Sequence, residues 1–424
     1  MSNKNSDTDA GPLADVKVLD MTRIIAGPLA TQMLGDMGAD VIKIERPEGG
    51  DDVRRVGPPW LHDEDGEPIQ QSTYFQAVNR NKRSVAVSFE SDEGRQLLLD
   101  LVAKVDIFVE NFRPGTLARY GLGYEQLRAV NPSLIYCSIS GFGQTGPYAS
   151  RSGYDYLAQG MSGLMNVTGH PLDEPGGGPM RVGIPLVDIF AGMNAGIGIL
   201  AALRHKDATG EGQHIDISLF DCGVASMLNP VSAWFNSREE IGLTGNDHPS
   251  AAPYGIFEVD DGHIIIATFS DREFIRLAAA LGHPEWSEDP MFALNGSRVA
   301  NRMALKKLVA EALKGRSKSE WVDILNKATV SCGPINTMAE LGDDPHVRDR
   351  ELIARTDHPI RGPVYAAGNP IRMSKSPVSY RRPPPMPGEH TRELLSELGL
   401  EATQIDALIS AGVIEIDETA DPAI

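Results

Sequence analysis

The stretch VKVLDMTRIIAGPLATQMLGDMGADVIKIE, residues 16–45, decides the fold. Val16–Asp20 is a short β-branched run, which is typical of a strand. Gly27-Pro28 opens a helix that we expect to continue to about Met37, because proline is favoured in the first helical turn. Asp40–Glu45 is a second strand, so this stretch predicts a strand–helix–strand unit.

The same alternation continues along the first half of the chain. We expect strands at 84–88, 106–110, 133–140 and 213–218, and helices at 92–104, 124–130, 188–204 and 220–235. Such alternation predicts an α/β fold whose Rossmann-like, mostly parallel sheet is covered by helices. The Gly- and Pro-rich stretch 141–184 is expected to be a long irregular segment of the kind that usually carries function.

The pattern of expected strands and helices changes near Arg238. A hairpin with strands at 255–258 and 263–269 is followed by helices at 271–281, 301–313 and 318–326, which indicates a smaller α+β unit. The expected domains are therefore 12–225 and 238–335, followed by a segment 350–424 that ends in a helix at 389–398.

Composition narrows the classes of partner and compartment. The net charge of −19 over 424 residues argues against nucleic acid or an anionic membrane as partner. The basic residues Arg80, Lys82 and Arg83 suit either a small polyanion or ordinary solvated charges. Three distant cysteines, the lack of a signal pattern, and an apolar run at 189–203 that is too short for a bilayer predict a cytoplasmic enzyme with a buried helix there.

Two kinds of site that are often recognised by motif, a dinucleotide site and a metal site, are not supported by this sequence. Gly141–Gly146 matches GxGxxG, but Pro147 follows at once and no helix opens there, so a glycine-rich turn is favoured over a dinucleotide site. The ten histidines show no ligand spacing, and no metal is expected.

Carboxylates remain as candidate reactive groups. Asp188 precedes the apolar run 189–203, where burial of an acid is costly. Aspartate is a preferred helix cap, and it can also serve as a nucleophile. Asp155 could likewise be a cap or a helper, and spacing alone does not decide between these roles.

Several segments, taken in order, resemble the family III coenzyme A transferases. They lie at 19–28, 35–45, 79–84, 109–115, 209–213 and 388–391, so the resemblance covers roughly residues 12 to 414. It implies that Asp188 is the nucleophile, in a helix N-terminal field that keeps it ionised, with Asp155 as its helper. It further implies that the backbone amides of Ile25 and Ala26 lie near the thioester, and that Tyr154 lies beside the thioester end of the substrate.

The resemblance also assigns binding residues. The implied CoA contacts are Arg46, Val87, Ser88, Phe89, Glu90, Asn111, Phe112, Arg113 and Arg119. A mobile loop over the reacting centre corresponds to Gly245, Asn246, Asp247 and His248, which replace consecutive glycines of formyl-CoA transferase. Members are interlocked homodimers in which the C-terminal segment returns to the large domain.

The chemistry implied is CoA transfer without a permanently bound cofactor, with acyl-CoA thioesters and small carboxylic acids as substrates. Attack by Asp188 on the thioester would lead through an anhydride to an aspartyl-CoA thioester. Several segments look most similar to transferases that move CoA from succinyl-CoA to dicarboxylates. A second carboxylate favours an arginine partner, for which Arg23, Arg54 and Arg181 are candidates.

Two other functions compete with this interpretation. The α-methylacyl-CoA racemases resemble the first half of the chain, but they have His-Asp where this chain has Tyr154-Asp155. Racemisation needs bases on both faces of the α-carbon, and tyrosine, with a pKa of about 10, is a poor substitute for histidine. A non-catalytic CoA-binding protein is the second alternative.

Overall fold

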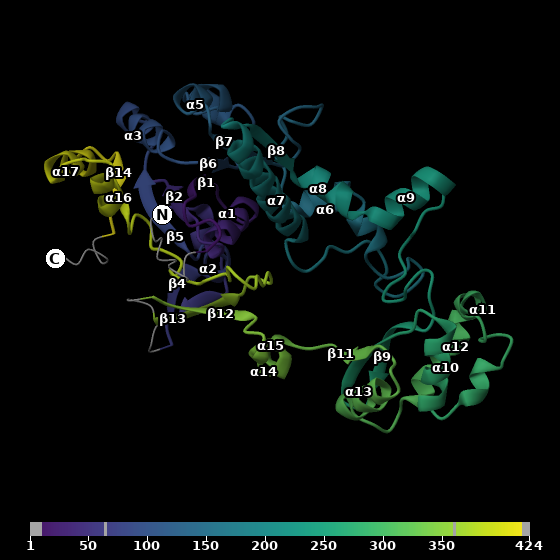
Figure 1. Cartoon of the computed structure of the whole chain (residues 1–424). Coiled ribbons are helices and arrows are strands. Elements are labelled where there is room, and N and C mark those ends of the chain that lie inside the picture. Colours follow the sequence, from purple (N-terminus) through teal and green to yellow (C-terminus); the bar gives the residue numbers. More distant parts are fainter. Residues whose placement is uncertain (1–10, 63–65, 359–361, 418–424) are drawn as a thin grey trace, which may run out of the picture. The chain divides into compact units, whose positions relative to one another are not determined.

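The computed structural model describes residues 11–62, 66–358 and 362–417, which fall into two compact units (Figure 1). The first unit comprises the chain up to residue 162, residues 183–227 and the chain from residue 348 onward. The second comprises residues 163–182 and 228–347. The second unit thus includes a short stretch, 163–182, that lies within the expected large domain.

A seven-stranded sheet forms the centre of the first unit, in the order β14-β5-β2-β1-β6-β7-β8. All neighbouring strands are parallel except β14, which is antiparallel to β5. The bounds are β1 Lys17–Met21, β2 Asp40–Glu45, β5 Lys82–Val87, β6 Ile107–Glu110, β7 Ile135–Ser140, β8 His214–Ser218 and β14 Ile414–Glu415. This sheet confirms the predicted α/β fold class.

Helices cover the sheet, and two small hairpins complete the unit. The helices are α1 Ala26–Asp36, α2 Thr73–Val78, α3 Asp92–Val102, α4 Thr116–Arg119, α5 Tyr124–Val130, α6 Asp155–Met161, α7 Leu186–Thr209, α8 Leu219–Ser226, α16 Thr391–Glu397 and α17 Ala402–Ser410. The hairpins are β3 Trp60–His62 with β4 Pro68–Ser72, and β12 Ile353–His358 with β13 Gly362–Ala367; a 3-10 turn, η1, spans Asp52–Arg55.

The chain changes direction across the sheet between β1 and β6. From β1 it adds β2 and β5 on one side, and β6, β7 and β8 on the other. The register pairs Met21 with Glu110, so the carboxyl ends of β1 and β6 lie side by side. In open α/β sheets a crevice forms outside the carboxyl ends of the strands at such a switch point, and ligands bind there.

Helix α7 packs beside α1 through Gly192. A Cβ at this position would lie 2.7 Å from the Ala26 carbonyl oxygen and 3.3 Å from the Leu29 side chain, so only glycine allows the close approach. Asp188 lies four residues earlier, on the same face of α7 as Gly192. The close packing therefore brings Asp188 toward the start of α1.

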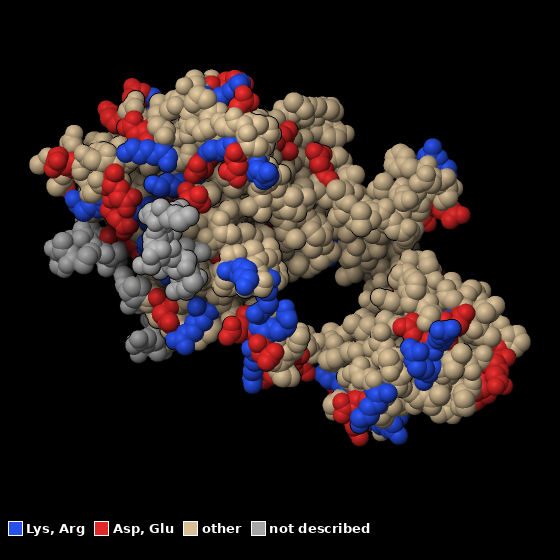
Figure 2. All heavy atoms as spheres, viewed as in Figure 1, with Lys and Arg blue, Asp and Glu red and all other residues tan. Residues whose placement is uncertain are grey.

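The prediction that α7 is buried is only partly correct. Met193, Ile197 and Leu200 are 44%, 65% and 36% exposed, and Figure 2 shows few charged side chains over α6, α7 and α8. By length and composition alone α7 could cross a membrane, but a core helix of an α/β sheet passes the same test. In this chain α7 packs on α1, β7 and β8, as such a core helix does.

The second unit is a small α+β structure. Its antiparallel sheet has the order β11-β10-β9, with β9 Tyr254–Val259, β10 Gly262–Ala267 and β11 Cys332–Pro334. Its helices are α9 Leu228–Ser237, α10 Asp271–Ala280, α11 Asn295–Ala300, α12 Arg302–Ala312, α13 Lys318–Lys327 and α14 Met338–Asp343, with 3-10 turns η2 Leu164–Val167 and η3 Pro284–Ser287. Helix α15, Pro345–Asp349, spans the boundary between the units.

Three local predictions are wrong. The segment from residue 350 does not end in the helix expected at 389–398, because α17 and β14 follow it. The single helix expected at 220–235 is interrupted at Met227, because Pro230 has no N–H and its ring would clash with the carbonyl of Ser226. The stretch 141–184 is not wholly irregular, since it contains α6 and η2. No helix opens within Gly141–Gly146, in agreement with a glycine-rich turn.

The basic residues Arg80, Lys82 and Arg83 are not surface charges. All three side chains are buried, and they pair with Asp36 at 2.6 Å, Asp20 at 3.0 Å and Asp40 at 2.6 Å, respectively. They hold α1, β1 and β2 together and offer no free charge to a polyanion.

Candidate active site

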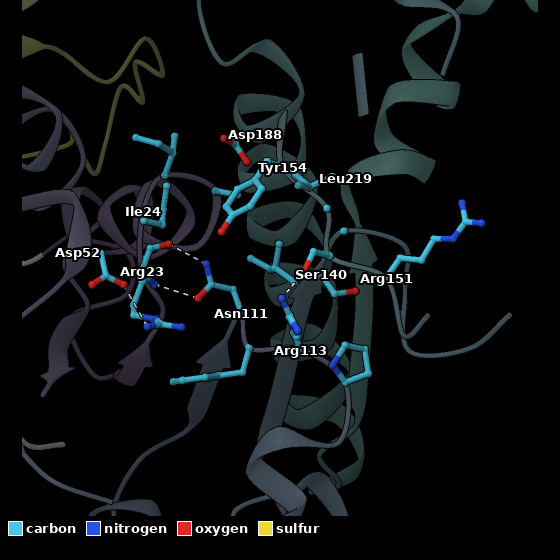
Figure 3. Close-up of a pocket in the computed structure, with 18 residues that line it drawn as sticks. Arg23, Ile24, Asp52, Asn111, Arg113, Ser140, Arg151, Tyr154, Asp188 and Leu219 are labelled. Atoms are coloured by element: carbon cyan, nitrogen blue, oxygen red, sulfur yellow. Dashed lines mark hydrogen bonds and ion pairs between the residues drawn. The ribbon is translucent and has the colours of Figure 1, made fainter. Parts of the chain in front are cut away.

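A pocket of about 200 Å³ lies at the carboxyl edge of the sheet, at the switch point (Figure 3). Segments that follow β1, β6 and β7 form part of its wall, and Tyr154 and Asp188 line it from the starts of α6 and α7. Among its other lining residues are Arg23, Ile24, Ile25, Ala26, Asp52, Asn111, Phe112 and Arg113. The strand order therefore assembles the pocket from distant parts of the sequence.

Asp188 lies in the first turn of α7, but it does not cap this helix. The N-cap residue is Pro185, and the Asp155 carboxylate accepts from the N–H groups of Val187 at 2.8 Å and Asp188 at 3.3 Å. Among the described residues the Asp188 carboxylate itself has no hydrogen-bond donor. Its oxygens are therefore free to act on a ligand in the pocket.

The charge state of Asp188 differs from the expectation. Burial raises the pKa of Asp188 to about 7, and the negative charge of Asp155 adds to the rise. The expectation that the helix field keeps Asp188 ionised therefore holds only for part of the molecules near pH 7. Desolvation and a neighbouring like charge outweigh the favourable field at the helix N-terminus.

Asp155 and Tyr154 approach the site from the start of α6. The second carboxylate oxygen of Asp155 accepts from the Gln159 amide at 2.7 Å, which fixes the orientation of the group. Tyr154 is the N-cap residue of α6, and its side chain is 70% exposed. Figure 3 shows its ring beside Asp188 on the pocket wall.

The backbone at Ile25 and Ala26 offers hydrogen-bond donors. Ala26 is the first residue of α1, and neither N–H has an acceptor among the described residues. The N–H groups at a helix start have no partner within the helix, and they favour negative charge. These donors line the same pocket as Asp188.

Asn111 holds the segment before these donors. Its side-chain oxygen accepts from the Arg23 N–H at 2.9 Å, and its Nδ2 donates to the Arg23 carbonyl at 2.7 Å. The dashed lines in Figure 3 mark this reciprocal pair. Asn111, for which the resemblance implies a CoA contact, therefore also fixes the backbone of the pocket wall.

A second cavity, of about 390 Å³, shares Arg23 and Phe112 with the first. The implied CoA contacts Arg46, Val87, Ser88, Phe89, Glu90 and Phe112 line it, whereas Asn111, Phe112 and Arg113 line the first pocket. Arg119, the last residue of α4, lines neither cavity. Two adjoining cavities along one edge suit an elongated ligand with its reactive end near Asp188.

The three candidate arginines differ in their surroundings. Arg23 is 39% exposed and pairs with Asp52 at 3.2 Å on the pocket wall. Arg54 is occupied by both oxygens of Glu45, at 2.8 and 2.6 Å, and its guanidinium lies over the Phe75 ring.

Arg181 lies in the second unit, like the expected loop Gly245–His248. Arg181 donates to the neighbouring carbonyl of Val182.

The loop Gly245, Asn246, Asp247 and His248 is tied within the second unit. Gly245 N–H donates to the Gly169 carbonyl at 2.9 Å, and Asp247 pairs with Lys306 at 2.9 Å. The His248 ring lies 4.9 Å from that of Tyr254. These contacts restrain the backbone of the loop, whereas consecutive glycines would allow it more conformations.

Sequence reasoning missed several residues of the site. Ile24 and Asp52 line the first pocket, and Asp51 lines the second. The position of Asn111 directly after β6 and of Arg23 shortly after β1 was the available signal, since both follow strands at the switch point. Among the described residues, no group of three potential ligands could hold a metal ion.

The fold is an α/β sheet with a pocket at its switch point, and the pocket is lined by the carboxylate of Asp188. Residues 13–391 match the family described as CoA-transferase family III, and the chain belongs to this family. It is a CoA-transferase, and CoA thioesters are substrates of this class of enzyme.

Named relatives and a solved structure agree with this assignment. The chain is 42% identical to the succinate–glutarate CoA-transferase of Agrobacterium fabrum, over 91% of this chain and 96% of the relative. It is 39% identical to the human succinyl-CoA:glutarate CoA-transferase, over 96% and 91% of the two chains. A crystal structure of a CaiB/BaiF family protein from Brucella suis superposes with a TM-score of 0.82 at 43% identity, covering 92% of this chain and all of the other.

Proposed function

We propose that this protein moves CoA from succinyl-CoA to a dicarboxylic acid of about the size of glutarate, with Asp188 as the nucleophile. The observation that carries the proposal is the Asp188 carboxylate, which lines a pocket together with the N–H groups of Ile25 and Ala26. In the part of the chain that the structure describes, the carboxylate has no hydrogen-bond donor and the two N–H groups have no acceptor. Similarity to two transferases named for glutarate supports the choice of substrates.

The proposed reaction proceeds through acyl transfers that need no water. An Asp188 oxygen attacks the thioester carbonyl, the C–S bond breaks, and a mixed anhydride and CoA thiolate result. The thiolate then attacks the aspartyl carbonyl of the anhydride, which releases the donor carboxylate and leaves CoA bound to Asp188 as a thioester. The acceptor carboxylate attacks this thioester to form a new anhydride, and the thiolate then takes the acceptor acyl group and frees Asp188.

Each tetrahedral intermediate carries a negatively charged oxygen. The N–H groups of Ile25 and Ala26 are suited to stabilise it, because preorganised donors at a developing oxyanion lower the barrier without reorganisation. Arg23 is the proposed partner of the acceptor's second carboxylate, since Arg54 is engaged by Glu45. CoA is proposed to lie along the second cavity, with Arg46 and Phe89 beside it.

A trapping experiment tests the nucleophile. Protein incubated with succinyl-CoA is treated with hydroxylamine, which converts an aspartyl thioester to a hydroxamate, and its peptides are then analysed by mass spectrometry. We expect the modification on the peptide containing Asp188 and its loss in Asp188→Asn. A modification on another carboxylate, or none in active protein, would refute the assignment.

We also propose that the enzyme is a cytoplasmic homodimer. The exposed face of α7, with Met193, Ile197 and Leu200, is apolar enough to be covered by a second copy of the chain. Light scattering coupled to size exclusion would give twice the monomer mass of 45.8 kDa. A monomer of full activity would contradict the proposal.

A further inference from the structure

The segment that carries the Ile25 and Ala26 donors contains a residue in an unfavourable backbone conformation. Ile24 has a φ of 71°, in the left-handed region that a β-branched residue rarely adopts. Such a conformation costs about 1–3 kcal/mol and persists only where the surroundings hold it. The contacts that hold Ile24 therefore decide where the next two N–H groups lie.

Two buried charges supply these contacts. The Asp51 carboxylate accepts from the Ile24 N–H at 3.2 Å and from the Val53 N–H at 3.0 Å. Lys43 donates to the Thr22 carbonyl at 2.9 Å and to Asp51 at 3.0 Å. The backbone on both sides of Arg23 is thus attached to one ion pair.

The Lys43–Asp51 pair is fully buried, with both side chains 0% exposed. Burial alone would lower the pKa of Lys43, but the charges of Asp51, Asp20 and Glu45 raise it, so Lys43 stays charged. A buried ion pair is weak support for stability, because well-packed apolar residues often serve equally well. Its contacts to Thr22 and Ile24 suggest another role.

We propose that Asp51, fixed by its ion pair with Lys43, is a positioning residue that holds Ile24 so that the N–H groups of Ile25 and Ala26 keep their place beside Asp188. The inference rests on the proposed function, since it assumes that these N–H groups stabilise the intermediates. It predicts that removal of Asp51 slows the chemical step. CoA binding should change little, because the Asp51 side chain is 0% exposed although the residue belongs to the wall of the second cavity.

The test compares Asp51→Ala with Asp51→Asn. Alanine removes the acceptor for Ile24, and we expect kcat to fall about 10- to 100-fold, as when an oxyanion donor is misplaced, while the Kd of free CoA changes less than about threefold. Asparagine keeps a side-chain oxygen as acceptor, and Lys43 keeps the charges of Asp20 and Glu45 beside it. This conservative variant is expected to recover most of kcat.

A matched control separates positioning from general destabilisation. Asp36 is another buried carboxylate, paired with Arg80 at 2.6 Å and absent from the lining of the pocket. Asp36→Ala is expected to lower the melting temperature but to leave kcat of the folded protein unchanged. Equal losses of kcat in Asp36→Ala and Asp51→Ala, or an unchanged kcat in Asp51→Ala, would overturn the inference.

If Asp51→Ala does not fold, Lys43→Met is the variant to test instead. Methionine has a similar volume, and the Asp51 carboxyl, left without its partner, can take up a proton instead of remaining as a buried charge. The Thr22 carbonyl loses its donor, and a fall of about tenfold in kcat is expected. An unchanged kcat would again overturn the inference.

The rate of hydroxylamine trapping at Asp188 distinguishes the two proposals. If wild-type protein is modified at Asp188 and the Asp51 variants are modified equally fast, the positioning role fails and the proposed function stands. If active wild-type protein is not modified at Asp188, the proposed function fails, and the inference fails with it.

Discussion

The Asp155 carboxylate caps the helix that carries Asp188. Its Oδ1 accepts from the N–H groups of Val187 and Asp188, at 2.8 and 3.3 Å, across 32 and 33 residues of sequence. Because Asp155 supplies this cap, the Asp188 side chain is not engaged with its own helix and stays available for the attack that we propose. Asp155 also acts on Asp188 through its charge, which contributes to the raised pKa.

Replacement of Asp155 should separate these two effects. Asp155→Asn keeps an acceptor oxygen for α7 but removes the charge, so the pKa of Asp188 falls and the acid limb of the kcat/KM profile moves from about pH 7 to lower pH. Asp155→Ala also loses the cap and should cost a further 0.5–2 kcal/mol or so of stability. Profiles of both variants with succinyl-CoA, alongside thermal unfolding, test this; an unmoved acid limb in Asp155→Asn would contradict it.

Asp188 should make the protein less stable as the pH rises. Its folded-state pKa of about 7 lies above the ordinary value of 3.8, so the folded protein binds more protons than the unfolded chain between these limits. The stabilisation by the protonated form is therefore complete below about pH 4 and lost as the pH rises through 7. Asp188→Asn should be more stable than wild type at pH 8, with a smaller difference at pH 5; urea unfolding at both pH values would show whether this holds.

Replacement of Arg23 should affect acceptor binding, whereas replacement of Arg54 should affect stability. Arg23→Met should raise the KM for a dicarboxylate acceptor about tenfold, through loss of charge-assisted hydrogen bonds, and leave a monocarboxylate unaffected. Arg54→Met leaves Glu45 buried without its partner and should destabilise the fold by about 3–5 kcal/mol with no change in acceptor preference. Steady-state kinetics with paired acceptors and chemical unfolding test both. A change of preference in Arg54→Met alone would reverse the assignment.

Two glycines of α7 form a matched pair for testing the α1–α7 contact. A Cβ on Gly192 would lie 2.7 Å from the Ala26 carbonyl, which is backbone and cannot move aside cheaply. Gly192→Ala should therefore cost about 1–3 kcal/mol and lower kcat. Gly196, one turn later, has no atom within 4 Å of its Cβ position, and Gly196→Ala should stabilise the helix by up to about 1 kcal/mol. Similar effects of the two substitutions would show that the close approach is unimportant.

Local patterns predicted much of the first unit. Asp40–Glu45 and Tyr124–Val130 have the predicted bounds, because each is a short segment with a clear period and flanking turn residues. Helix α6 was missed because its seven residues lie in a glycine- and proline-rich stretch and begin without a Ser or Thr cap. The short strand β14 was missed because only pairing with β5 defines it.

The contacts within the candidate site could not be predicted from the sequence. The resemblance singled out Asp188, Asp155 and Tyr154, and the structure places Asp188 and Tyr154 on one pocket. The reciprocal bonds between Asn111 and Arg23, and the attachment of Ile24 to Asp51, depend on strand order, which local periodicity does not contain. The raised pKa of Asp188 depends on burial, which requires the packed α1 and α7.

The bond from Val187 to Asp155 also bears on how the site folds. It closes a loop of 32 residues, and part of this loop, 163–182, belongs to the second unit. Closing such a loop costs chain entropy, which the other contacts at the start of α7 must offset. Hydrogen exchange at the Val187 amide therefore measures how stably the start of α7 is held, without an activity assay.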